Sequence, residues 1–195
     1  YGLICDIGGS SMELAALEGG GSIGRRRSVD LGPLKLMGIT GGKRAIKAHI
    51  KARIADLKAK FPEDHQRLFL VGGSWRAIAR VDMERRGYPL KVLHEYRMTP
   101  KAILETIKYI AKTDIETLRA QTGTSLERLR LVPLAAIVLK ELLRQLKPRD
   151  VAISSYGIRE GLLYEQMSEE LRQRDPLIEA ARHAEAMSAR IPGFG

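Results

Sequence analysis

The sequence is poor in cysteine, histidine and aromatic residues, and each shortage excludes a class of protein. A single cysteine in 195 residues rules out a disulfide framework and predicts a cytoplasmic protein. The four histidines are scattered without the spacing of metal ligands, so we expect no zinc site. Aromatic residues make up 5% of the chain and do not alternate with basic ones, which disfavours nucleic acid as a partner.

Long apolar runs are also missing. No run approaches the roughly 20 residues that cross a bilayer, and no signal peptide precedes Tyr1, so we expect no membrane partner. The chain opens directly on an apolar segment and closes on the turn-like residues 191–195. These two ends predict an excised piece of a longer protein.

Positive charge is in excess. Lys and Arg number 33 and Asp and Glu number 23, a formal net charge of +10 that favours anionic partners. Basic residues gather in Arg25-Arg26-Arg27 and along one side of a predicted helix, at Lys43, Lys47, Lys51 and Lys58. They would form either a track for a long anionic polymer or an ordinary solvated face.

The apolar pattern predicts an α/β domain. Short apolar runs that end at turns predict strands over residues 1–7, 12–17, 23–31, 68–71 and 151–154, with a turn over 18–22. Helical spacing predicts helices over residues 43–61, 75–84, 99–112, 132–146, 158–170 and 175–189, with Pro133 at the start of its helix. Short turns join the first three strands, so we expect a mixed five-stranded sheet, three antiparallel strands and then two parallel ones, with helices on both faces. Residues 168–175 are the predicted linker.

The sharpest local feature is Asp6-Ile-Gly-Gly-Ser-Ser-Met-Glu13. A buried strand delivers an aspartate, and the glycines that follow let backbone N–H groups converge on an anion. Asp6 beside such a loop suits Mg²⁺, which prefers carboxylates and phosphate oxygens. The alternative is a plain hairpin turn that the aspartate caps.

Two further junctions between a strand and a helix carry polar residues. In Leu70-Val-Gly-Gly-Ser-Trp-Arg76 the free N–H groups of a helix start and a nearby arginine could bind an anion, unless this is only a tight junction. Trp75 is expected in the core. The other junction is Ser154-Ser-Tyr-Gly-Ile-Arg-Glu-Gly161. Its residues would either bind a ligand or form an ordinary turn with an ion pair on the surface. Ligands bind at the carboxyl ends of parallel strands, so we expect the first two loops to lie side by side.

These motifs resemble those of the exopolyphosphatase and guanosine pentaphosphate phosphohydrolase (Ppx/GppA) family. The first is similar to the family's D-I-G-G-G-S-x-E signature, and Ser28-Val-Asp-Leu-Gly32 to its S-x-x-x-G strand. Val71-Gly-Gly-Ser-Trp-Arg76 resembles its G-G-T-x-R loop, and Tyr156-Gly-Ile-Arg-Glu-Gly161 its G-x-R-E-G ending. The four motifs follow in the family's order, which makes the set far more specific than any one of them.

The resemblance implies a ribonuclease-H-like domain of the actin-like ATPase superfamily, the second of two that flank a cleft. Residues 1–167 would be this domain, and residues 168–195 a linker and the first helix of a C-terminal helical region. The first domain, with its own phosphate loop and catalytic base, would lie upstream, and the longer protein could be a homodimer. The fragment alone is therefore expected to fold but not to hydrolyse phosphoanhydrides at a useful rate.

The implied activity is metal-assisted hydrolysis of the terminal phosphoanhydride bonds of inorganic polyphosphate or of guanosine pentaphosphate (pppGpp). Asp6 and Glu13 would bind magnesium and activate water. The residues that would bind phosphate are Gly8, Gly9, Ser10, Ser11, Gly72, Gly73, Ser74 and Arg76. Ser10 replaces the family's third glycine and narrows the allowed backbone, because positive φ is costly without glycine. Ser74 replaces a threonine but keeps the hydroxyl.

Two other functions compete with this one. A sugar or acid kinase of the same superfamily would use ATP, although the sequence has no clear signature of an adenine pocket. A non-catalytic module that binds phosphate or nucleic acid would not need two carboxylates, Asp6 and Glu13, beside its phosphate loop.

Overall fold

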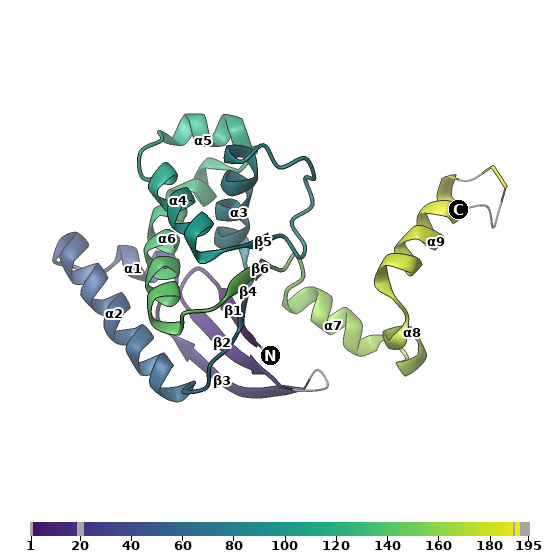
Figure 1. The fold of residues 1–195 in the computed structure, drawn as a ribbon, viewed down its shortest axis with the longest axis horizontal. Helices are drawn as coiled ribbons and strands as arrows, with labels where there is room; N and C mark the ends of the chain where they lie inside the picture. Colours follow the sequence, from purple (N-terminus) through teal and green to yellow (C-terminus); the bar gives the residue numbers. More distant parts are fainter. Residues whose placement is uncertain (1, 19–21, 189, 192–195) are drawn as a thin grey trace. The chain divides into compact units, whose positions relative to one another are not determined.

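The computed structural model describes residues 2–18, 22–188 and 190–191. The chain divides into two compact units, residues 1–155 and 156–195 (Figure 1). The predicted domains, residues 1–167 and 168–195, stay a prediction. Tyr1, the middle of the predicted turn at residues 18–22 and most of the predicted C-terminal turn lie outside the described residues.

The first unit holds one mixed sheet, whose strand order is β3-β2-β1-β4-β6-β5. The strands are β1 (Gly2–Ile7), β2 (Met12–Leu17), β3 (Ile23–Val29), β4 (Arg67–Val71), β5 (Arg97–Met98) and β6 (Asp150–Ile153). As predicted, β1, β2 and β3 pair antiparallel, and β4 and β6 continue the sheet parallel to β1.

The sheet has six strands and not the predicted five. The extra strand, β5, is two residues long and pairs antiparallel with β6 at the sheet edge. The Ile153 N–H donates to the Tyr96 carbonyl (3.0 Å) and the Glu95 N–H to the Ile153 carbonyl (2.9 Å), so backbone bonds to β6 hold this segment in place. Two residues are too few to show the alternating apolar pattern by which a strand is predicted from sequence.

The helices of the first unit pack on one face of the sheet. They are α1 (Pro33–Met37), α2 (Gly42–Lys60), α3 (Gly73–Arg85), α4 (Pro100–Ile110), α5 (Ile115–Thr122) and α6 (Leu126–Leu146) (Figure 1). Alternate strand residues such as Leu3, Cys5 and Leu70 are buried in the core, whereas Ile4 and Phe69, which point to the other face, are partly exposed. Within the first unit this differs from the predicted layers of helices on both faces.

Helix α6 begins earlier than predicted. Leu126–Leu146 is a single helix, so Pro133 lies inside it and not at its start. Leu129 and Val132 are buried upstream of the proline, while Pro133 itself is exposed. Burial of the upstream apolar residues therefore outweighs the backbone hydrogen bond that proline cannot donate.

The second unit contains α7 (Ile158–Gln166), α8 (Glu169–Gln173) and α9 (Pro176–Ser188). Helix α8 falls within residues 168–175, whose role as a linker stays a prediction. The Ser168 hydroxyl accepts a hydrogen bond from the Leu171 N–H at 3.4 Å, and this cap starts the short helix.

Candidate active site

Strands β1, β2 and β3 bring two carboxylates and a hydroxyl into one row. Asp6 on β1 lies directly opposite Glu13 on β2, and Glu13 lies opposite Ser28 on β3. The Ser28 hydroxyl donates to Glu13 Oε1 at 2.8 Å. Residues directly opposite across a ladder point to the same face, so the two predicted metal-binding carboxylates are neighbours.

The first loop, residues 8–11, follows β1 and is fixed by backbone hydrogen bonds. The Gly8 N–H donates to the Ser11 carbonyl at 3.0 Å. The Gly32 N–H donates to the Ser10 carbonyl (3.1 Å) and the Leu34 N–H to the Gly9 carbonyl (2.8 Å). Among the described residues, no acceptor is found for the N–H groups of Gly9 and Ser10, which leaves them available to a ligand.

Ser10 fits this loop without strain. The described residues with positive φ do not include Gly8, Gly9 or Ser10, so the expected penalty for replacing the family's third glycine is absent. The glycine that the loop does require is Gly32. A Cβ atom on Gly32 would lie 2.4 Å from the carbonyl carbon and oxygen of Gly9.

The second loop, residues 72–74, follows β4 and meets the end of β1. Asp6 pairs with Val71 in the parallel ladder. Gly72 has φ of +117°, and a Cβ atom there would lie 2.6 Å from the Ile7 carbonyl oxygen and 3.3 Å from Oδ1 of Asp6. The expectation that the two loops lie side by side is therefore confirmed.

Helix α3 starts at this point of convergence. Its first residues, Gly73 and Ser74, have no capping side chain, so their N–H groups form the positive end of the helix. Arg76, in the first turn, donates from Nη1 to the Ser155 carbonyl oxygen at 3.0 Å, and its charge acts on Asp6. Trp75 is fully buried, as predicted.

A second arginine, which the sequence analysis missed, lies at the same helix start. A Cβ atom on Gly73 would be 3.0 Å from Nε of Arg128, which α6 carries in its first turn. Within the described part of the chain, Arg128 has no hydrogen bond or ion pair. A guanidinium beside the positive end of a helix is unfavourable unless an anion lies between them. No local signal marks Arg128, because only the tertiary fold brings α6 to this loop.

Burial and charge set the acidity of the site. Burial, together with the neighbouring Glu13 carboxylate, raises the pKa of Asp6, and the Arg76 charge offsets part of that rise. Burial also raises the pKa of the Cys5 thiol, so this cysteine is an inert core residue.

The two carboxylates fit a magnesium ion that takes most of its ligands from water and substrate. Among the described residues, no group of three or more His, Cys, Asp or Glu side chains gathers around one point. Two adjacent carboxylates still suit Mg²⁺, which commonly binds one or two carboxylates and completes its shell with water and substrate phosphate. Asp6 and Glu13 would hold such an ion.

Of the third predicted junction, Ser154 and Ser155 belong to the first unit, where Ser155 accepts from Arg76, and residues 156–161 belong to the second unit. The Gly157 N–H donates to Glu160 Oε2 at 2.7 Å, which makes Glu160 a cap of α7. This favours the local structural role over a ligand role.

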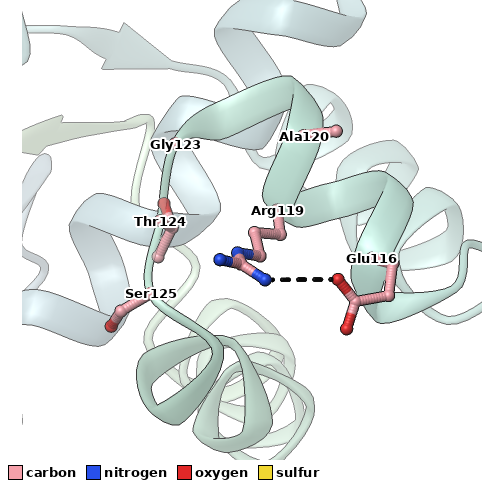
Figure 2. A pocket seen from close by; sticks show the side chains of 6 residues that line it. All are labelled: Glu116, Arg119, Ala120, Gly123, Thr124 and Ser125. Atoms are coloured by element: carbon pink, nitrogen blue, oxygen red, sulfur yellow. Dashed lines mark ion pairs between the residues drawn. The ribbon is translucent and has the colours of Figure 1, made fainter.

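A separate hollow of about 470 Å³ lies where α5 meets α6. It is lined by Glu116, Arg119, Ala120, Gly123, Thr124 and Ser125 (Figure 2). The Arg119 guanidinium, which forms an ion pair with Glu116 at 3.6 Å, points from α5 toward the turn before α6. None of the predicted site residues lines this hollow.

Most of the basic residues predicted as a track are exposed. Along α2, Lys43, Lys47 and Lys51 are exposed and Lys58 is half-buried. On β3, Arg25, Arg26 and Arg27 are all exposed, and Arg25 donates to the Lys60 carbonyl oxygen and to Glu63. No described helix is long and apolar enough to cross a membrane.

The fold and the site together define an α/β domain in which two adjacent carboxylates and two glycine-rich loops lie at the carboxyl ends of β1 and β4. Residues 1–170 match the model of the Ppx/GppA phosphatase family, and the chain belongs to that family. Among curated proteins, no sequence match is found.

Solved structures share this fold. The Ppx/GppA phosphatase of Aquifex aeolicus superposes with a TM-score of 0.69 at 16% identity, over 85% of this chain and 57% of its own. An exopolyphosphatase from Cytophaga hutchinsonii superposes with a TM-score of 0.71 at 18% identity, over 84% and 55%. The present chain therefore spans little more than half the length of these relatives.

Proposed function

We propose that this chain forms one wall of an enzyme that hydrolyses terminal phosphoanhydride bonds, with inorganic polyphosphate or pppGpp as substrate. The proposal includes its placement as the second ribonuclease-H-like domain of an actin-like ATPase fold, with the other wall supplied upstream. The observation that supports it most is the meeting of both glycine-rich loops beside Asp6. Family membership and the named exopolyphosphatase relative agree with it.

Each group at the site has a role in such a reaction. The N–H groups of Gly9, Ser10, Gly73 and Ser74 would bind phosphate oxygens, as would the hydroxyls of Ser10, Ser11 and Ser74. Arg76 and Arg128 would stabilise the charge that accumulates on those oxygens in the transition state. A bound magnesium ion would supply further charge neutralisation. Asp6 and Glu13 would hold the ion and orient the attacking water.

The carboxylates separate this function from a passive anion-binding module. Two adjacent negative charges, on Asp6 and Glu13, repel a phosphate unless a cation lies between them. The net charge of +10 suits a polyanionic substrate. A cytoplasmic location stays a prediction from the single cysteine.

The test is phosphate release from long-chain polyphosphate with magnesium, in a polypeptide that extends this chain upstream. We expect Asp6→Asn and Glu13→Gln each to lower release by about 100-fold, because each removes a charge that acts on the reacting group. Asp56→Asn, an exposed carboxylate of α2, is the matched control and should retain full release. Unchanged release in Asp6→Asn would contradict the proposal.

A further inference from the structure

A strained turn brings His94 to the carboxyl end of the sheet, close to the candidate site. Glu95 has φ of +58° and is one of two described residues other than glycine with positive φ. Its N–H donates to the Ile153 carbonyl at 2.9 Å, and the Tyr96 N–H donates to the Leu93 carbonyl at 3.1 Å. Residues other than glycine adopt a positive φ only at an energetic cost, and such strained residues are common at functional sites.

His94 and Arg76 hold the same residue from opposite sides. The Ser155 N–H donates to Nδ1 of His94 at 3.4 Å, and the Ser155 carbonyl oxygen accepts from Nη1 of Arg76 at 3.0 Å. The preceding N–H, of Ser154, donates to the Leu70 carbonyl at 2.8 Å. Ser155 is therefore bonded to the strained turn and to the arginine of α3, and its neighbour Ser154 is bonded to β4.

This chain of contacts reaches the carboxylates. Arg76 is the cation whose charge lowers the pKa of Asp6 against the rise due to burial. Arginine keeps several donors on one planar group, so a bond that fixes Nη1 orients the remaining donors. The carbonyl of Ser155 fixes Nη1, and His94 limits the freedom of Ser155.

We propose that His94 is a positioning residue of the phosphate site, which acts through Ser155 to orient Arg76 toward the bound phosphate. It touches neither substrate nor metal in this role. The inference rests on the proposed function for the ligand, but the link from His94 to Arg76 can be tested without any ligand.

Asparagine provides the test of mechanism, because its Oδ1 occupies nearly the place of the histidine Nδ1 and accepts the same hydrogen bond. The experiment compares His94→Ala, His94→Asn and the control His183→Ala, an exposed histidine of α9, in the 195-residue chain. Binding of magnesium pyrophosphate is measured by calorimetry, and exchange of the Ser155 amide by NMR.

We expect His94→Ala to weaken pyrophosphate binding about fivefold, somewhat less than the roughly 10–100-fold loss typical of residues that support a ligand directly. The same variant should speed exchange of the Ser155 amide by about tenfold, because its hydrogen-bond acceptor is lost. His94→Asn should return both values to within twofold of the parent, and His183→Ala should change neither. A merely structural histidine would not be rescued by asparagine.

Two results would overturn the inference: parent-like exchange and binding in His94→Ala, or an equal loss in His94→Ala and His94→Asn. If the parent binds no pyrophosphate, the proposed function fails, and amide exchange still decides whether His94 holds Ser155.

Discussion

The two loops of the site share a Gly-Gly-Ser sequence, yet they use glycine for different reasons. The second loop needs Gly72 itself, because its φ of +117° and its approach to Ile7 both exclude a side chain. The first loop has no positive φ, and its tight contact comes from Gly32, a residue more than twenty positions away. Glycine is thus required at the second loop for the backbone conformation, and near the first loop because a side chain would overlap the neighbouring backbone.

The largest effect should come from Gly72→Ala. Strain in a region reserved for glycine, added to the overlap with the Ile7 carbonyl, should lower the free energy of unfolding by about 3 kcal/mol. Gly87→Ala is the matched control, since Gly87 has φ of +59° and nothing within 4 Å of an added Cβ. It should cost only about 1 kcal/mol, for the backbone alone. Equal losses in a urea titration would show that the contact with β1 does not matter.

Gly32→Ala should cost about 2 kcal/mol and weaken phosphate binding, because the added methyl group displaces the first loop. Gly32 has φ of −66°, so this substitution introduces crowding without backbone strain. Gly38→Ala, where the nearest atom to a Cβ is 3.5 Å away, should be tolerated. Circular dichroism in denaturant and calorimetry with pyrophosphate measure the two effects. Wild-type binding in Gly32→Ala would mean that the first loop is not part of the site.

Loss of Arg76 should matter more than loss of a lysine on α2. Arg76→Ala is expected to weaken polyphosphate binding about tenfold, because the arginine is held at the helix start by Ser155. Lys47→Ala should change it less than twofold, since exposed charges substitute for one another. Titration of both variants at one salt concentration decides the matter. Equal losses would indicate a diffuse basic surface in place of a defined site.

The smallest effect is expected for the stability of Asp6→Asn, a variant that should be more stable than the parent although it loses activity. The folded-state pKa of Asp6 is raised, so this carboxyl stabilises the fold in acid and that contribution is lost as pH rises through its pKa. Asp6→Asn, without metal at pH 7, should therefore raise the melting temperature by roughly 2 °C. The difference should vanish below about pH 3, where the carboxyl is protonated in both states. A lower melting temperature for Asp6→Asn at pH 7 would contradict this.

The sequence predicts the site better than its surroundings. Asp6, Glu13 and the second loop lie in short segments that combine a buried strand, a turn and a polar residue, so local pattern and tertiary position agree. Arg128 and His94 are not predicted from the sequence. Helix α6 and the strained turn at Glu95 bring them to the site from distant segments of the chain. The same limit applies to β5, whose pairing with β6 depends on backbone bonds rather than on apolar alternation.

Helix boundaries fail where packing overrides local preference. Pro133 signals a helix start, but buried Leu129 and Val132 extend the helix upstream of it. At Ser10 the motif misleads in another way. The family's glycine at this position suggests a positive φ, but Ser10 does not have one.

The central claim is that the two loops bind one phosphate chain together. The most direct test is an NMR titration of the 195-residue chain with magnesium pyrophosphate, which follows the backbone amides of Gly9 and Ser10 in the first loop and Gly73 and Ser74 in the second. We predict that all four signals shift along one binding curve with a single dissociation constant. Shifts confined to one loop, or different midpoints for the two loops, would contradict a shared site.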